Sequence, residues 1–131
     1  MIRLKRAVLD TSVLMLAYEG VDVIGEIERV LESKPELVVT SRVVEELQRL
    51  ASSQSTRKRR AARLALQLVE RYCKVVSAKG ETADDTIIDY VVRDREAIVV
   101  TADRELRRRL RELGIPHIYY KEERKGFKLE G

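Results

Sequence analysis

The chain has 131 residues, 44% of them hydrophobic, which is enough for one compact domain, 1–131, with its own core. The single cysteine, Cys73, excludes an internal disulfide and a cysteine-based zinc site, and no apolar run is long enough for a signal segment or a membrane span, so we expect a cytoplasmic protein outside the membrane. Lys and Arg number 26 against 22 Asp and Glu, so the net charge of +4 does not by itself indicate a nucleic-acid partner.

Strand-like and helix-like segments alternate in the first part of the chain. Residues 7–9 form a short apolar run that predicts a strand, and helical spacing follows at residues 13–18. A second amphipathic segment, 22–32, comes before the apolar run 37–39, which predicts another strand. Helical spacing then returns over residues 43–50.

The same alternation continues after the small polar linker 51–56. The further predicted elements are a helix at 57–72, a strand at 74–76, a helix that begins at Thr82, a strand at 97–100, a helix from Asp103 to Leu113 and a strand at 115–120. The tail, 121–131, is a candidate for a short terminal hairpin. Alternating strands and helices pair in parallel through right-handed crossovers. We therefore predict an α/β fold, a three-layer α/β/α sandwich with a central, mainly parallel five-stranded sheet.

Four separated carboxylates lie where an apolar element meets a helix: Asp10, Glu46, Asp84 and Asp103. Asp10 and Asp103 each follow a predicted strand, and ligands of an open parallel sheet bind at that end of the strands. Both acids also have an ordinary explanation as helix caps. Glu46 lies on an apolar helix face, where burying an unpaired carboxylate is costly. The alternative to a functional role is a structural ion pair.

Two adjacent acids compete for one position in the third acidic segment. Asp85 stands three residues after Thr82 and completes a capping box, which gives it a structural role. Asp84 precedes the apolar residues of the same helix by helical spacing, which directs it along the inward face. We therefore favour Asp84 as the functional acid, with Asp85 as the alternate.

Such a cluster is typical of a site for divalent cations. Carboxylates without His or Cys suit Mg²⁺ or Mn²⁺ better than zinc, and without a cation they would raise one another's pKa values. Two ions roughly 3.5–4 Å apart activate water and stabilise the leaving oxygen in phosphodiester hydrolysis, and one ion does part of this. A haloacid-dehalogenase-like site is disfavoured because Ser12 stands where a second Asp is required.

Four stretches carry a family resemblance: VLDTSVLM around Asp10, SRVVEEL around Glu46, TADDTIIDYV around Asp84 and VVTADRELRRRLRELGIPHI around Asp103. With them the chain resembles the PIN-domain family of metal-dependent ribonucleases from about residue 7 to residue 118. The resemblance implies that the four acids surround Mg²⁺ or Mn²⁺ and that metal-activated water cleaves RNA. The candidates to hydrogen-bond the carboxylates or a bound water are Thr11, Ser12 and Thr101.

The resemblance leaves several biological roles open. The family includes VapC-type toxins, which have a small antitoxin protein as partner, and factors that process ribosomal RNA. A non-catalytic member that binds RNA or protein is a further alternative, because an acidic set shows capacity and not turnover. Family members often form homodimers or higher homo-oligomers, and we expect the same here.

The start of the helix at 57–72 is densely basic, with Arg57, Lys58, Arg59 and Arg60 in succession. Positive charge there opposes the helix dipole, and the phosphates of RNA are a natural source of compensation. The alternative is a solvated face with scattered ion pairs. The arginines of residues 107–111 pose the same choice.

Overall fold

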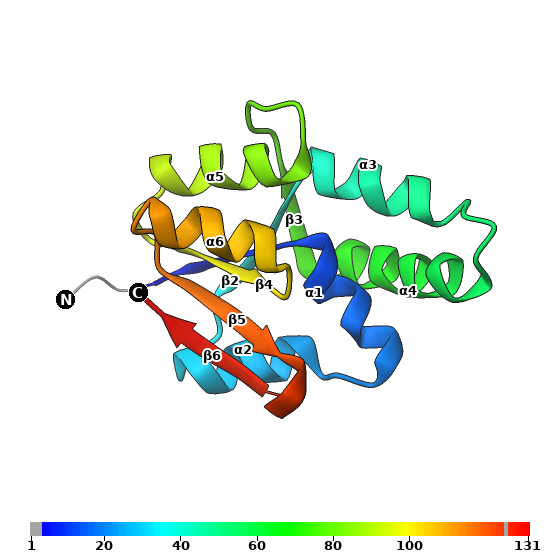
Figure 1. Ribbon diagram of the computed structural model, residues 1–131, viewed down its shortest axis with the longest axis horizontal. Coiled ribbons are helices and arrows are strands. Elements are labelled where there is room, and N and C mark those ends of the chain that lie inside the picture. The colour runs from blue at the N-terminus through cyan, green and yellow to red at the C-terminus, as the bar shows by residue number, and fades with distance from the viewer. Residues whose placement is uncertain (1–3, 125) are drawn as a thin grey trace.

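The computed structural model describes residues 4–124 and 126–131 (Figure 1). The strands are β1 (Arg6–Leu9), β2 (Glu36–Thr40), β3 (Cys73–Val76), β4 (Ala97–Thr101), β5 (His117–Lys121) and β6 (Gly126–Glu130). The helices are α1 (Thr11–Met15), α2 (Val23–Leu31), α3 (Ser41–Leu50), α4 (Thr56–Tyr72), α5 (Ala83–Arg93) and α6 (Arg104–Glu112), with short 3₁₀ segments η1 (Leu16–Glu19) and η2 (Glu122–Arg124). None of these helices is both long and apolar enough to cross a membrane.

The strands form one sheet in the order β3-β2-β1-β4-β5-β6. The first five are parallel, as the sequence predicts, and β6 pairs antiparallel with β5. The predicted count of five strands is therefore wrong by one, because the tail returns along the sheet edge after η2. Phe127 of β6 is buried there with its ring centroid 5.0 Å from that of Tyr120.

Helices cover both faces of the sheet, which confirms the predicted three-layer α/β/α sandwich (Figure 1). On one face α5 packs on β2 and β4, and α6 packs on β5. On the other face α1 packs on β4, α4 on β3 and α2 on β6. The strands β1 and β4 are covered on both sides, and this is why they read as continuous apolar runs and not as alternating patterns.

The strand order reverses between β1 and β4, so the connections that leave these two strands go to opposite faces of the sheet. Such a switch point leaves a crevice at the carboxyl ends of the strands. Asp10 follows β1 directly, and its backbone N–H donates to the carbonyl of Val100 in β4 over 3.0 Å. Asp103 follows β4 after one intervening residue. The topology therefore brings the first and last of the four acids to the same edge of the sheet.

At the opposite end of the sheet, Asp94 joins the end of α5 to β1 and β4. Its carboxylate accepts from Arg6 Nε at 2.5 Å and Arg6 Nη2 at 2.9 Å, from the Tyr90 hydroxyl at 3.0 Å and from the backbone N–H of Glu96 at 3.1 Å. The hydrogen bonds from Arg6 lower the pKa of Asp94 to about 2. This junction holds the two central strands in register with α5.

We predict that Asp94→Asn lowers the free energy of unfolding at pH 7 by about 1–2 kcal/mol, because the ion pair with Arg6 is lost and water partly screens this pair in the wild type. Since the folded-state pKa lies below the ordinary value, the carboxylate stabilises the fold above pH 4 and loses this effect as the pH falls towards 2. Urea unfolding of both proteins at pH 7 and near pH 2.5 tests this. A difference that is equally large at both pH values would contradict the electrostatic explanation.

Candidate active site

A pocket opens at the carboxyl ends of β1 and β4, between α1, α3, α5 and α6. Its lining residues are Asp10, Thr11, Ser12, Glu46, Thr82, Ala83, Asp84 and Asp103. The structure thus brings together the four acids that the sequence singles out, although they come from four different segments of the chain. Of the three candidate supporting residues, Thr11 and Ser12 line the pocket, and Thr101 lies behind Asp10.

Asp10 is the most buried of the acids, with 4% of its surface exposed. One carboxylate oxygen accepts from the backbone N–H of Thr11 at 2.8 Å and so caps α1. The other accepts from the hydroxyls of Ser12 and Thr101, each at 2.8 Å. Asp10 therefore caps α1 and lines the pocket at the same time.

The two hydroxyls also connect Asp10 to the turn after β4. Ser12 Oγ accepts from the backbone N–H of Ala102 at 3.0 Å, and Thr101 Oγ1 accepts from the backbone N–H of Asp103 at 3.0 Å. Ser12 and Thr101 therefore hold the first and last acids in a fixed relation. The hydroxyl of Thr11 is buried and has no hydrogen-bond partner among the residues that the structure describes.

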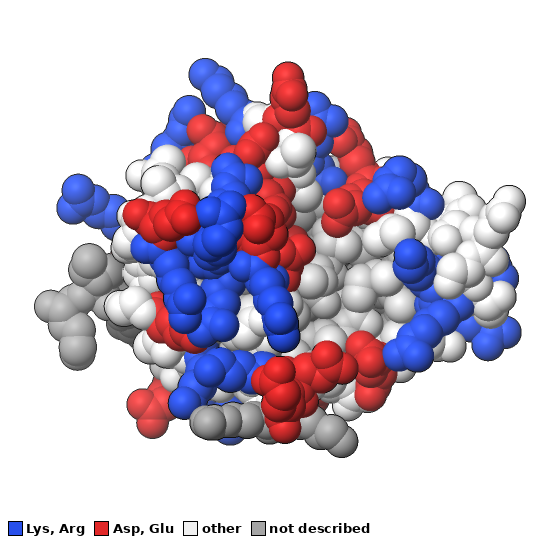
Figure 2. Space-filling view, viewed as in Figure 1, with Lys and Arg blue, Asp and Glu red and all other residues white. Residues whose placement is uncertain are grey.

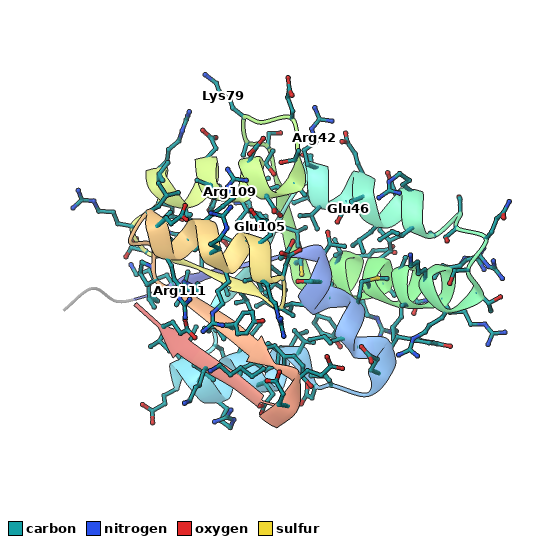
Figure 3. The ribbon with its side chains drawn as sticks, viewed as in Figure 1. Arg42, Glu46, Lys79, Glu105, Arg109 and Arg111 are labelled. Atoms are coloured by element: carbon teal, nitrogen blue, oxygen red, sulfur yellow. The ribbon has the colours of Figure 1, made fainter. Side chains whose placement is uncertain are left out.

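Asp103 caps α6 with one oxygen, which accepts from the backbone N–H groups of Glu105 at 2.7 Å and Leu106 at 3.1 Å. Glu46 projects from the middle of α3 (Figure 3) and is half-buried beside the fully buried Leu47. In the described part of the chain, Glu46 makes no ion pair or hydrogen bond. A structural ion pair therefore does not explain its inward position.

Asp84 and Asp85 face different surroundings although they are neighbours. Asp84 lines the pocket, and burial followed by the charge of Asp103 raises its pKa. Asp85 instead pairs with Arg109 of α6 at 3.0 Å, and this hydrogen bond, with those from Thr82, lowers its pKa. The structure therefore places Asp84, the acid favoured from the sequence, in the pocket. Asp85 instead joins α5 to α6 through its ion pair with Arg109.

One buried contact between α3 and α5 is not evident from the sequence. The Thr86 hydroxyl donates to the carbonyl of Ala83 at 2.7 Å, so the Thr40 hydroxyl donates to Thr86 Oγ1 at 2.8 Å. Both threonines are fully buried. This bond sets the start of α3, which carries Glu46, against the first turn of α5, which carries Asp84. Thr40 was recognisable only as a helix cap, and Thr86 gave no separate signal.

The electrostatics of the pocket favour a bound cation. Burial raises the pKa of Asp10 to about 6, the nearby charges of Asp84 and Asp103 add to the increase, and the hydrogen bonds from Ser12 and Thr101 oppose it. The lining offers oxygen donors and neither His nor Cys, a set that suits Mg²⁺ or Mn²⁺. Within the described residues, however, no three such side chains already lie close enough together to hold a metal ion. The donor chemistry fits a divalent cation, and binding would have to draw the acids together.

The predicted nucleic-acid-binding residues lie outside this pocket, on the first two turns of α4. Arg57 pairs with Glu19 at 3.0 Å, and Arg59 donates to the carbonyl of Ser53 at 3.0 Å. Lys58 and Arg60 are exposed.

We predict that Asp10→Asn stabilises the metal-free protein as the pH rises. In the wild type the unfolded chain releases the Asp10 proton near pH 3.8 and the folded chain releases it near pH 6, so stability falls across this window. The unfolding free energy of the variant relative to wild type should therefore increase between pH 4 and pH 7, by up to about 3 kcal/mol. Urea unfolding in EDTA measures this difference, and a difference that is independent of pH would contradict the raised pKa.

The comparisons with known proteins agree with this geometry. The sequence pattern of the family described as PIN like domain matches residues 7–123. Ribonuclease VapC9 of Archaeoglobus fulgidus is 34% identical over 126 residues, which cover 95% of this chain and 90% of that protein. Ribonuclease VapC4 of Methanocaldococcus jannaschii is 35% identical over 114 residues, or 85% of this chain and 86% of that protein.

Among solved structures, the PIN domain endonuclease Utp24 has a similar fold, with a TM-score of 0.74 at 23% identity over 95% of this chain and 90% of that chain. The residues that carry the sequence resemblance are the same ones that the fold gathers at the switch point of the sheet. On these grounds the chain belongs to the PIN-domain family.

Proposed function

We propose that this protein is a Mg²⁺- or Mn²⁺-dependent endoribonuclease whose cation is held by Asp10, Glu46, Asp84 and Asp103. The observation that carries the proposal is the convergence of these four acids, from four segments, on one pocket at the sheet's switch point. Two relatives that cover most of the chain are named ribonucleases, which supports RNA as the substrate.

The acids of the pocket differ in how firmly hydrogen bonds hold their carboxylates. Asp10 has both carboxylate oxygens held by hydrogen bonds and supplies the fixed point of the site. Glu46 and Asp84 line the pocket and make no hydrogen bond within the described residues, so their oxygens are available to a cation. A divalent cation bound there would activate water for attack on the phosphodiester and stabilise the leaving oxygen.

No histidine takes part in this chemistry. His117, the only histidine, is buried in β5, where Nδ1 lies 2.9 Å from the carbonyl of Ile115 and Nε2 lies 3.5 Å from Glu130. A carboxylate of the pocket is therefore the group available to accept the proton of the attacking water. Burial raises the pKa values of Asp10 and Asp84 in the metal-free protein, and a bound cation would favour the charged form of both carboxylates.

We predict that Asp84→Asn abolishes metal-dependent RNA cleavage, with a loss of at least about a hundredfold, and that the neighbouring Asp85→Asn retains cleavage within a few-fold. The reason is that Asp84 faces the pocket and Asp85 faces Arg109. The measurement is cleavage of single-stranded and structured RNA by metal-stripped protein with added Mg²⁺, Mn²⁺ or EDTA. Asp10→Asn and Asp103→Asn should behave like Asp84→Asn.

The two neighbouring variants control for each other, since each removes one negative charge from the first turn of α5. Circular dichroism confirms that each variant is folded. Equal loss in both would show that the charge of the turn matters and not the pocket position. If the wild-type protein binds RNA but does not cleave it with either metal, the nuclease proposal is wrong and a role in RNA binding replaces it.

We further propose that the protein acts as a toxin of the VapC type, in the cytoplasm, as a homo-oligomer and with a small antitoxin protein as its partner. The support is that both ribonuclease relatives carry the VapC name. Expression of the wild-type chain in a bacterial host should then arrest growth, and Asp103→Asn should not. Normal growth with active wild-type enzyme would instead favour an RNA-processing role.

A further inference from the structure

Two helices of this protein are rich in arginine, and their charges are compensated very differently. On α6 every arginine reaches an acid: Arg104 with Glu123 at 3.9 Å, Arg107 and Arg111 with Glu130 at 3.1 and 3.7 Å, Arg108 with Glu112 at 2.6 Å and with Glu105, and Arg109 with Asp85 at 3.0 Å. The positive charge of α6 is thus used within the fold.

Five cations lie on the first two turns of α4 and on the turn that follows, and one of them pairs with an acid in the described part of the chain. Arg57 pairs with Glu19, and in the described part of the chain Arg59 donates to Ser53 of the connecting loop and to Thr56 at the start of the helix. The other three, Lys58, Arg60 and Arg63, are exposed and make no ion pair in the described part of the chain. Arg60 and Arg63, three positions apart, share one side of the helix, whereas Lys58 lies on another side, and we call the three residues together the α4 basic patch.

The α4 basic patch opposes helix formation. The first turn of α4 contains no acidic residue to complement the positive end of the helix dipole. Arg60 and Arg63 are separated by three positions, so their like charges lie side by side on the helix surface and repel. Ser55 caps the helix, but within the described fold no acid pairs with these three side chains, so the patch is explained better by a polyanionic partner than by stability.

The patch lies at the end of the α3–α4 hairpin (Figure 1). The two helices pack along each other, α3 carries Glu46, and α1, which begins after Asp10, packs on α4. On the face shown in Figure 2, Lys and Arg gather over the start of α4, and a stretch of uncharged surface separates them from the acids near the middle of the molecule. An extended ligand that leaves the pocket along this face would therefore meet basic side chains at the start of α4.

We propose that Lys58, Arg60 and Arg63 bind the phosphates of the RNA strand that flanks the cleaved bond, and that the arginines of α6 do not. This inference rests on the proposed nuclease function and names the surface that holds its substrate. Cations that contact phosphates position a strand without reading its bases, and they make binding depend on salt. The patch would therefore supply affinity for long RNA.

The test compares two matched double variants: Arg60→Gln with Arg63→Gln on α4, and Arg108→Gln with Arg111→Gln on α6. Both remove two exposed arginines three positions apart on one helix, so net charge and spacing change equally. Binding of a fluorescent single-stranded RNA 20-mer is measured by anisotropy in EDTA from 50 to 300 mM KCl. Cleavage of the same RNA and of a trinucleotide is measured separately with Mn²⁺.

The α4 variant should bind the 20-mer about tenfold more weakly near 0.15 M salt, with a salt slope smaller by about 1.4, and the α6 variant should bind nearly like wild type. In cleavage, the α4 variant should show a raised KM for the 20-mer with unchanged kcat, and unchanged kinetics on the trinucleotide. Equal effects of both variants, or no effect of the α4 variant on affinity and slope, would overturn the proposal.

The binding assay in EDTA does not depend on catalysis, so it separates this inference from the proposed function. If the α4 variant shows the expected loss of RNA affinity but the wild-type protein never cleaves RNA, the patch remains assigned to RNA binding and the proposed nuclease activity is wrong. If the α4 variant keeps full RNA affinity but changes its mass in light scattering, the patch belongs to a protein interface and the RNA assignment is wrong.

Discussion

The burial of the Asp10 carboxylate at the end of β1 is the constraint on which the site depends. A buried charge needs donors, and here a backbone N–H and two hydroxyls supply them. Those hydroxyls, from Ser12 and Thr101, also bind the backbone after β4, so satisfying Asp10 aligns the turn that carries Asp103. One local requirement thereby fixes the relation between two distant acids.

The remaining acids are positioned by helices that pack against that centre. The Thr40–Thr86 hydrogen bond joins α3 to α5, and the ion pair between Asp85 and Arg109 joins α5 to α6. These two contacts surround the pocket and leave Glu46 and Asp84 facing it. The residues next to the site therefore fix the helices around it, and Glu46 and Asp84 keep negative charge without a partner in the described fold. A cation or a shared proton relieves this condition.

Periodicity and capping residues predicted much of this arrangement. Apolar runs bounded by Asp10 and Asp103 identified β1 and β4, and helical spacing placed Glu46 on the inward face of α3, because these patterns follow from burial of a local segment. The sixth strand was predicted only as part of a candidate hairpin: β6 is five residues long, and its partner lies across η2. The helix expected at 13–18 instead begins at Thr11 and continues as η1, because Asp10 itself is the cap.

The sequence by itself determined the parallel α/β architecture and the identity of the four candidate acids, because secondary structure, capping and burial depend on residues close together in the chain. Only the tertiary structure decided which charges are compensated. Arg107 and Arg109 meet acids 23 and 24 positions away, whereas Arg60 and Arg63 meet none in the described fold. Ion pairs form between side chains that topology brings together, so the arginines of α6 become part of the fold, whereas these two arginines of α4 stay available to a partner.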